Sequence, residues 1–320
     1  MAVYTPLDEA TIGALVEAYG LGELLAWHGI QAGVENSNFY IETTARRVIL
    51  TLYEKRVNPA ELPFFLGVME HLAGRGVPCP TPLADRAGRV LREVAGRPAA
   101  CVTFLDGRSI RRADAAQCRA LGAALAELHL AGRDYPGERA NDLGCAGWRR
   151  LFDRIGDRAD EVAPGLTAEL AGELESLEAS WPEALPRGVI HADLFPDNVF
   201  FAGERVSGLI DFYFACTDQL AYDLAICLNA WCFERDGAFN TTHARAMTAG
   251  YRRVRPLEAG EVAALPVLCR GAALRFLLTR LFDWLNRVEG ALVTPKDPLE
   301  YVLKNRFHRG IRGPGAYGLD

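Results

Sequence analysis

Two aspartates and one asparagine with the spacing of a phosphotransfer site lie in the segment HADLFPDNVFFAGERVSGLIDF. Asp193 and Asn198 are spaced D-x-x-x-x-N shortly after His191, and Asp211 follows Asn198 by thirteen residues. A carboxylate can orient an attacking hydroxyl and accept its proton, whereas hard oxygen ligands suit Mg²⁺. We therefore predict Asp193 as the catalytic base and Asn198 and Asp211 as magnesium ligands.

The residues between these side chains predict how they meet. Two short apolar runs, 199–201 and 206–210, flank a GER turn and indicate a hairpin that returns Asp211 to Asn198. His191 is expected to bond to backbone around the loop rather than to react. Each aspartate alone could be a loop cap or the partner of an arginine, but the joint pattern favours the functional interpretation.

Composition narrows the class of protein. The chain has 320 residues, a formal net charge of −6 and a pI near 5.6, so it lacks the basic surface that nucleic acid requires. No stretch reaches the ~18 uninterrupted apolar residues of a membrane span, and the first residues do not resemble a secretion signal. Eight cysteines without a CxxC pair indicate reduced thiols. We expect a cytoplasmic protein with no nucleic-acid or membrane partner.

Secondary-structure patterns divide the chain into two parts. Residues 1–105 contain extended runs, with a turn around 43–47, and a helix over 59–73; a first helix is expected to be capped by Thr5. Residues 106–320 carry long helical patterns, including 221–233, 242–254 and 262–288. The glycine-rich end, RGIRGPGAYGLD, is expected to fray. A small strand-rich lobe thus precedes a larger helical one.

The catalytic segment resembles that of the aminoglycoside phosphotransferase and choline kinase superfamily, in which the loop reads HxDxxxxN and the metal aspartate follows isoleucine. The triplet Ile210-Asp211-Phe212 has this form. More narrowly, GVENSNFYIET, VILTLYEKR, HADLFPDNVFF and GLIDFYFACTDQLAYDLAICLNAWC are similar to the homoserine kinases of this superfamily, and the similarity runs from Tyr4 to about Arg309.

This resemblance implies an α+β, bilobal protein kinase-like fold with a small antiparallel-sheet N-lobe and a larger, mainly helical C-lobe. It implies that residues 1–105 cover the nucleotide and that residues 106–320 carry catalysis and the acceptor. The cofactors would be ATP and Mg²⁺. The reaction would transfer the γ-phosphate to the side-chain hydroxyl of L-homoserine, a step of threonine biosynthesis.

The resemblance also implies a nucleotide-binding loop. GVENSN lies where the family's nucleotide-covering hairpin loop falls, but it has one glycine, Gly33. The side chains of Asn36, Ser37 and Asn38 would therefore share phosphate binding with backbone amides. An ordinary turn is the alternative.

Three further nucleotide contacts of the family have less exact counterparts in this chain. Thr51 stands at the position of the usual strand lysine, and the nearest lysine is Lys55, which could instead be a surface charge. Glu61 is the nominal partner of that lysine, with Glu70 as its competitor. Phe104, Leu105 and Asp106 are expected to form the hinge, with backbone groups that meet adenine.

An amino-acid alcohol needs a cation for its carboxylate and an anion for its ammonium group. Candidates are Tyr213, Asp218, Arg280 and Asp283, although Arg280 and Asp283 could form a salt bridge within one helix instead. Two other functions stay open: a kinase of choline, a sugar or an aminoglycoside, and a nucleotide-binding module that has lost catalysis. The sequence leaves monomer and homodimer open.

Overall fold

The computed structural model describes residues 4–31, 36–54, 57–287 and 295–319. The chain divides into two compact units, Met1–Asp106 (unit 1) and Gly107–Asp320 (unit 2). The boundary expected from the sequence lies one residue earlier. The assignment of nucleotide to the first part and acceptor to the second stays a prediction.

Unit 1 is built on a five-stranded antiparallel sheet of order β1-β2-β3-β5-β4. Its strands and helices are β1 (Leu24–Ile30), β2 (Ser37–Thr43), β3 (Arg47–Leu52), β4 (Leu91–Val94), β5 (Arg97–Thr103), α1 (Glu9–Tyr19), the 3-10 turn η1 (Pro59–Glu61) and α2 (Leu62–Gly74). The turn expected around 43–47 joins β2 to β3. The extended run before this turn is divided between two strands, since β1 ends at Ile30 and β2 starts at Ser37.

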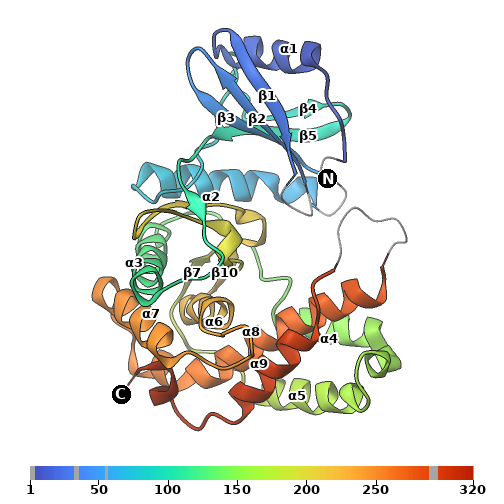
Figure 1. The fold of residues 1–320 in the computed structure, drawn as a ribbon, viewed down its shortest axis with the longest axis vertical. Coiled ribbons are helices and arrows are strands. Elements are labelled where there is room, and N and C mark those ends of the chain that lie inside the picture. The colour runs from blue at the N-terminus through green and yellow to red at the C-terminus, as the bar shows by residue number, and fades with distance from the viewer. Residues whose placement is uncertain (1–3, 32–35, 55–56, 288–294, 320) are drawn as a thin grey trace. The chain divides into compact units, whose positions relative to one another are not determined.

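Helix α1 begins three residues later than the sequence suggested. Asp8, not Thr5, is its N-cap and accepts a hydrogen bond from the Thr11 amide at 2.8 Å. The Thr5 hydroxyl instead donates to Glu54 Oε1 at 2.8 Å. The helix lays Ile12, Val16 and their apolar neighbours on one face of the sheet, where they form the core of unit 1 with the inward side chains of β2 and β3 (Figure 1).

Unit 2 holds two small sheets surrounded by helices. The strands are β6 (Arg108–Ser109), β7 (Arg187–Ile190), β8 (Val199–Ala202), β9 (Arg205–Leu209) and β10 (Cys216–Gln219). β6, β8 and β9 form one sheet, and β7 pairs with β10 in the other. The predicted hairpin is confirmed, since β8 and β9 pair from Val199 opposite Leu209 to Ala202 opposite Arg205.

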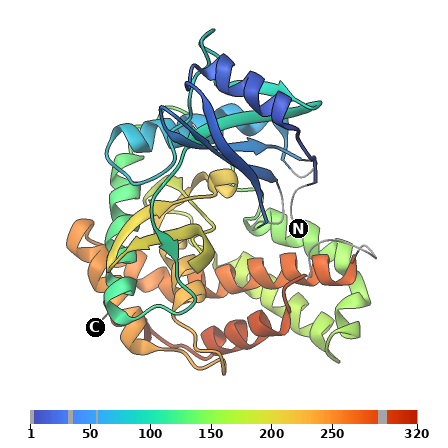
Figure 2. The same ribbon diagram turned by 45° about the horizontal axis from the view of Figure 1, so that its top comes forward.

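Helices make up most of unit 2. They are α3 (Ala115–Ala131), α4 (Cys145–Ile155), α5 (Leu166–Ser180), α6 (Leu220–Trp231), α7 (Thr241–Val254), α8 (Ala259–Leu285) and α9 (Leu299–Arg309), with short 3-10 turns η2 (Gly156–Glu161), η3 (Pro196–Asn198), η4 (Phe212–Phe214) and η5 (Pro314–Tyr317). α8 runs along the helical layer beside α9 (Figure 2). α8 is long and apolar enough to cross a membrane by length and composition alone, but it is mostly buried in the protein, as a core helix is.

The C-terminal segment is packed, so the expectation that it frays was wrong. Tyr317 in η5 is fully buried, and its hydroxyl lies 2.9 Å from His308 Nδ1 on α9. Leu319 is buried as well. Two buried apolar side chains hold this segment in spite of its glycines. The eight cysteines are all free thiols, as expected.

Candidate active site

The loop between β7 and β8, residues 191–198 and here called the catalytic loop, brings Asp193 and Asn198 together. The Asn198 side-chain amide donates to the Asp193 carbonyl at 2.8 Å and to Asp193 Oδ2 at 3.1 Å. These bonds use the nitrogen of Asn198 and leave its Oδ1 as the end that can bind a cation. The 3-10 turn η3 places Asn198 at the start of β8, because the Asn198 amide bonds back to the Phe195 carbonyl.

The hairpin returns Asp211 to the same place. The Ile210 amide donates to the Asn198 carbonyl at 3.0 Å, so Asp211 follows directly on a residue bonded to the catalytic loop. Asp211 has a left-handed backbone, with φ of 68°, and its side chain is exposed. This conformation is uncommon outside glycine and turns the chain sharply as it leaves β9.

His191 bonds to backbone on both sides of the loop, as predicted. Its Nδ1 accepts from the Asp193 amide at 3.2 Å, so its Nε2 carries the proton and donates to the Ile210 carbonyl at 3.0 Å. Burial lowers the pKa of His191 to about 4, against the opposing charge of Asp223. A neutral imidazole therefore ties the catalytic loop to the end of β9.

Asp223 on α6 holds the start of the catalytic loop. Its two carboxylate oxygens accept from the amides of His191 at 2.7 Å and Ala192 at 2.9 Å. Burial would raise the pKa of Asp223, but hydrogen bonds from His129 and from the His191 amide help to lower it overall. Asp223 therefore braces the start of the loop. On its other side, His129 Nε2 lies 3.2 Å from Asp223, and His129 Nδ1 lies 2.7 Å from the Tyr251 hydroxyl.

Asp193 is set in a low-dielectric environment with several charges around it. Burial raises the pKa of Asp193 well above its usual value; the Arg275 cation opposes the increase and the Asp211 anion adds to it. A carboxyl group that holds a proton more readily is a better proton acceptor for a hydroxyl at neutral pH. Arg275, on α8, was not among the predicted site residues. The signal was a single arginine within the apolar run GAALRFLL.

The donor set at this place fits a magnesium ion. It offers one carboxylate, Asp211, and one amide oxygen, Asn198 Oδ1, next to the Asp193 carboxylate. Mg²⁺ prefers oxygen ligands, and in phosphotransfer sites it takes few from the protein and the rest from phosphate and water. Across the part of the chain that is described, no group of three or more His, Cys, Asp and Glu side chains is arranged for a metal. A site with two protein ligands needs no such group.

The residues expected to bind nucleotide phosphates make contacts within unit 1. Gly33 and Lys55 lie outside the described residues. The Ser37 hydroxyl donates to Glu54 Oε1 at 2.7 Å and accepts from two N-terminal amides, so its side chain is already engaged. Asn36 accepts from the Glu54 amide at 3.3 Å. Asn38 accepts from the Thr51 hydroxyl at 2.8 Å, directly across β2 and β3.

The other expected nucleotide contacts lie elsewhere in unit 1. Glu61 ends η1 and precedes the first residue of α2. Phe104 and Leu105 follow β5 and are not part of a strand. The Phe104 amide donates to the Arg47 carbonyl at 3.3 Å, and the Arg47 guanidinium lies over the Phe104 ring. These two residues precede Asp106, which is the last residue of unit 1.

The four predicted acceptor contacts come from three elements of unit 2: η4, β10 and α8. Asp218 on β10 accepts from Asn141 and from the Gln219 amide, each at 2.8 Å, and lies 3.7 Å from Arg187. Arg280 on α8 donates from Nη1 to Glu300 at 2.6 Å and stacks on Tyr301. Tyr213 lies in η4, two residues after Asp211, and Asp283 lies near the end of α8.

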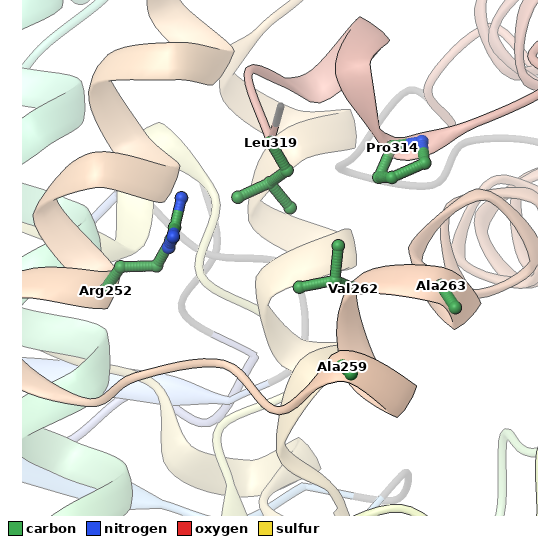
Figure 3. Close-up of a pocket in the computed structure, with 6 residues that line it drawn as sticks. All are labelled: Arg252, Ala259, Val262, Ala263, Pro314 and Leu319. Carbon is green, nitrogen blue, oxygen red and sulfur yellow. The ribbon is translucent and has the colours of Figure 1, made fainter.

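A pocket of about 410 Å³ lies in unit 2 away from these residues. Its lining residues come from the end of α7, the start of α8 and the C-terminal segment: Arg252, Ala259, Val262, Ala263, Pro314 and Leu319 (Figure 3). Arg252 is the one charged side chain among them and extends toward Leu319 (Figure 3). None of Asp193, Asn198 and Asp211 lines this pocket, so it is not the candidate active site.

Known proteins are similar to this chain along most or all of its length. The profile of the phosphotransferase enzyme family matches residues 26–257. The homoserine kinase of Xanthobacter autotrophicus is 62% identical over 319 residues, covering 100% of this chain and 99% of that protein. The homoserine kinase of Rhodospirillum rubrum is 60% identical, with the same coverage.

Solved structures share the fold. An amicoumacin kinase in complex with AMP-PNP superposes with a TM-score of 0.70 at 16% identity, covering 95% of this chain and 92% of that one. An ethanolamine kinase of Plasmodium vivax gives a TM-score of 0.66 at 13% identity, covering 97% and 92%. The predicted α+β, kinase-like fold is thereby confirmed. On the extent of the profile match and the identity to these full-length relatives, the chain belongs to the phosphotransferase enzyme family.

Proposed function

We propose that this chain phosphorylates the side-chain hydroxyl of L-homoserine with ATP, forming O-phospho-L-homoserine and ADP. Identity of 56–62% to proteins named homoserine kinases, along the full length of the chain, supports the acceptor. The observation that carries the chemistry is the convergence of Asp193, Asn198 and Asp211 through the catalytic loop and the β8–β9 hairpin. This reaction is a step of threonine biosynthesis.

The proposed roles follow from what each group can do. Asp193 accepts the proton of the acceptor hydroxyl while that oxygen forms a bond to the γ-phosphorus. The bond from the γ-phosphorus to the β–γ bridging oxygen breaks, and ADP leaves with the electron pair. Asn198 holds Asp193 in place through its Nδ2. With Asn198 Oδ1 and Asp211 as its protein ligands, Mg²⁺ would neutralise charge that develops on the phosphate oxygens.

Nucleotide contacts are assigned to unit 1. We keep Gly33, Asn36, Ser37 and Asn38 as the phosphate-binding loop, with Ser37 acting through its backbone amide because its hydroxyl is engaged by Glu54. Lys55 is the proposed replacement for the strand lysine, with Glu61 as its partner. Phe104 and Leu105 are the proposed adenine contacts.

For the acceptor, Arg280 is the proposed carboxylate ligand. Its side chain is mostly buried, and only Nη1 forms hydrogen bonds with described residues, which leaves Nη2 and Nε as donors. Asp283 and Asp218 are the candidates for the ammonium group, and Tyr213 is the candidate for lining the site. We further propose that the enzyme acts in the cytoplasm without a nucleic-acid or membrane partner, as a monomer or homodimer.

The acceptor is tested by ADP release with Mg²⁺ and ATP against L-homoserine, L-threonine, L-serine, choline, methylthioribose and an aminoglycoside. A preference for L-homoserine of at least about tenfold in kcat/KM over every other alcohol is expected. Preference for choline, a sugar or the aminoglycoside would overturn the acceptor while leaving the roles of Asp193, Asn198 and Asp211 in place. Nucleotide binding without turnover on any acceptor would favour a module that has lost catalysis.

A further inference from the structure

Arg275 is a buried cation with an unusual set of partners. It lies within α8, is 1% exposed, and makes no ion pair with a carboxylate among the described residues. Its guanidinium is 4.6 Å from the centre of the Phe276 ring and 5.6 Å from that of Phe214. Burying a charge without a counter-ion is costly, so an arginine at such a place needs a specific partner.

That partner is the catalytic loop. Arg275 Nη1 donates to the Ala192 carbonyl at 2.5 Å, which is the one hydrogen bond that its guanidinium makes within the described part of the chain. The Arg275 Nε is buried and has no partner there. The Arg275 side chain is therefore held by its hydrogen bond to the catalytic loop, without further hydrogen bonds to other described residues.

Ala192 is in a conformation that requires support. Its φ is 65°, in the left-handed region that a residue with a Cβ rarely adopts. Its amide is bonded to Asp223, its carbonyl to Arg275, and the following amide, that of Asp193, to His191. The two peptide groups of Ala192 are thus both fixed by side chains from other elements, and the next residue is Asp193.

The Arg275 charge also acts on Asp193. Among the charges around that carboxyl group, Arg275 is the largest influence, and it favours the ionised form. The loss of Arg275 would therefore release the Ala192 carbonyl. It would also remove the positive charge that acts most strongly on Asp193.

We propose that Arg275 is a positioning residue for phosphoryl transfer: from α8 it holds the Ala192 carbonyl and thereby fixes the orientation of Asp193. The effect on turnover rests on the proposed function; the hold on the loop does not. Arg275 needs no contact with ATP or acceptor for this role, so its removal should affect kcat more than either KM.

The test compares Arg275→Met with Arg270→Met. Arg270 is on the same helix and binds Glu173 through two hydrogen bonds of 3.0 and 2.7 Å, so its loss also removes a partly buried guanidinium, but one without a bond to the catalytic loop. Arg275→Lys keeps the charge and one donor. The measurements are kcat and both KM values, thermal unfolding, and hydrogen–deuterium exchange of peptides covering residues 189–198.

Arg275→Met is expected to lower kcat by about 100-fold or more with both KM values within about threefold, whereas Arg270→Met keeps kcat within about threefold. Arg275→Lys should recover kcat about tenfold relative to methionine without reaching wild type. A kcat for Arg275→Met no lower than that of Arg270→Met would overturn the proposal. If the methionine variant does not fold, wild-type kcat in Arg275→Lys would overturn it.

Hydrogen exchange tests whether Arg275 holds the catalytic loop, and it does so independently of the proposed function. Arg275→Met should speed exchange across 189–198, and Arg270→Met should not. If wild type does not phosphorylate homoserine, this comparison still decides whether Arg275 holds the loop. Equal exchange in wild type and Arg275→Met would contradict the hold on Ala192.

Discussion

Backbone strain at single residues is concentrated at the candidate active site. Within the described residues, three positions other than glycine have positive φ: Ala95, Ala192 and Asp211. Ala192 directly precedes the proposed base, Asp193, and Asp211 is itself a proposed metal ligand. Strained conformations persist where surrounding contacts fix them, and they cluster where side chains must be aimed. The sequence did not indicate this strain, because alanine and aspartate do not mark a left-handed position as glycine does.

Asp211→Ala tests the metal assignment. Because Asp211 is the only carboxylate proposed as a ligand, its loss should weaken Mg²⁺-dependent binding of an ATP analogue by at least about tenfold, measured by calorimetry with and without EDTA. Asp197→Ala is the matched control, since Asp197 is an exposed carboxylate of the same loop that lies 3.8 Å from Lys296. Equal magnesium-dependent affinity in wild type and Asp211→Ala would rule out the assignment.

At the scale of elements, the contact between α3 and α7 depends on two glycines. A Cβ at Gly122 would lie 2.1 Å from the Met247 carbonyl oxygen, and one at Gly250 would lie 2.0 Å from that of Arg119. Glycine therefore lets the two helix backbones approach closely. This contact positions His129 on α3 beside Tyr251 on α7, next to Asp223.

Gly250→Ala should destabilise the protein by about 1–3 kcal/mol, because the obstructing atoms are backbone and cannot move aside cheaply. Gly172→Ala is the control: Gly172 is exposed within α5 with nothing within 4 Å of an added Cβ. There alanine should stabilise by about 0.5–1 kcal/mol. Urea unfolding measures both. A neutral or stabilising Gly250→Ala would show that the helices are not in close contact.

Local patterns predicted some elements and missed others for identifiable reasons. The β2–β3 and β8–β9 hairpins could be read from alternating apolar residues around polar turns. Helix α9 was missed, and the C-terminal segment was expected to fray, because burial of Tyr317 against His308 is a long-range contact that composition does not reveal. For the candidate site, the spacing of Asp193, Asn198 and Asp211 could be recognised in the sequence. The contact of Arg275 with the catalytic loop could not, because it depends on how α8 packs.

At the scale of the molecule, buried neutral histidines link stability to pH. Burial lowers the pKa of His308 to about 3, helped by the nearby Lys304 charge, and lowers that of His191 to about 4. In the unfolded chain these groups take up protons near pH 6.5. Their contribution to the free energy of unfolding is therefore complete above that pH. It declines as the pH falls toward the pKa values of the folded protein, because in this range only the unfolded state gains protons.

Between pH 6.5 and 5, His308 alone should reduce the free energy of unfolding by about 2 kcal/mol. His308→Gln should be less stable than wild type at pH 7.5 but lose less stability on acidification. His28→Gln, at an exposed histidine of β1, is the control for the substitution itself. Urea unfolding at a series of pH values measures the slopes. The same slope in His308→Gln and wild type would contradict this account.

The central claim is that Asp193, held beside Asn198 and Asp211, transfers phosphate from ATP to homoserine. The most direct measurement is phosphorus NMR of the products formed from Mg²⁺, ATP and L-homoserine by wild type and Asp193→Asn, with nucleotide affinity measured for both. Wild type should form O-phospho-L-homoserine, and Asp193→Asn should bind nucleotide normally while its rate falls by about 10²–10⁴. Absence of phosphohomoserine with wild type, or an undiminished rate with Asp193→Asn, would contradict the claim.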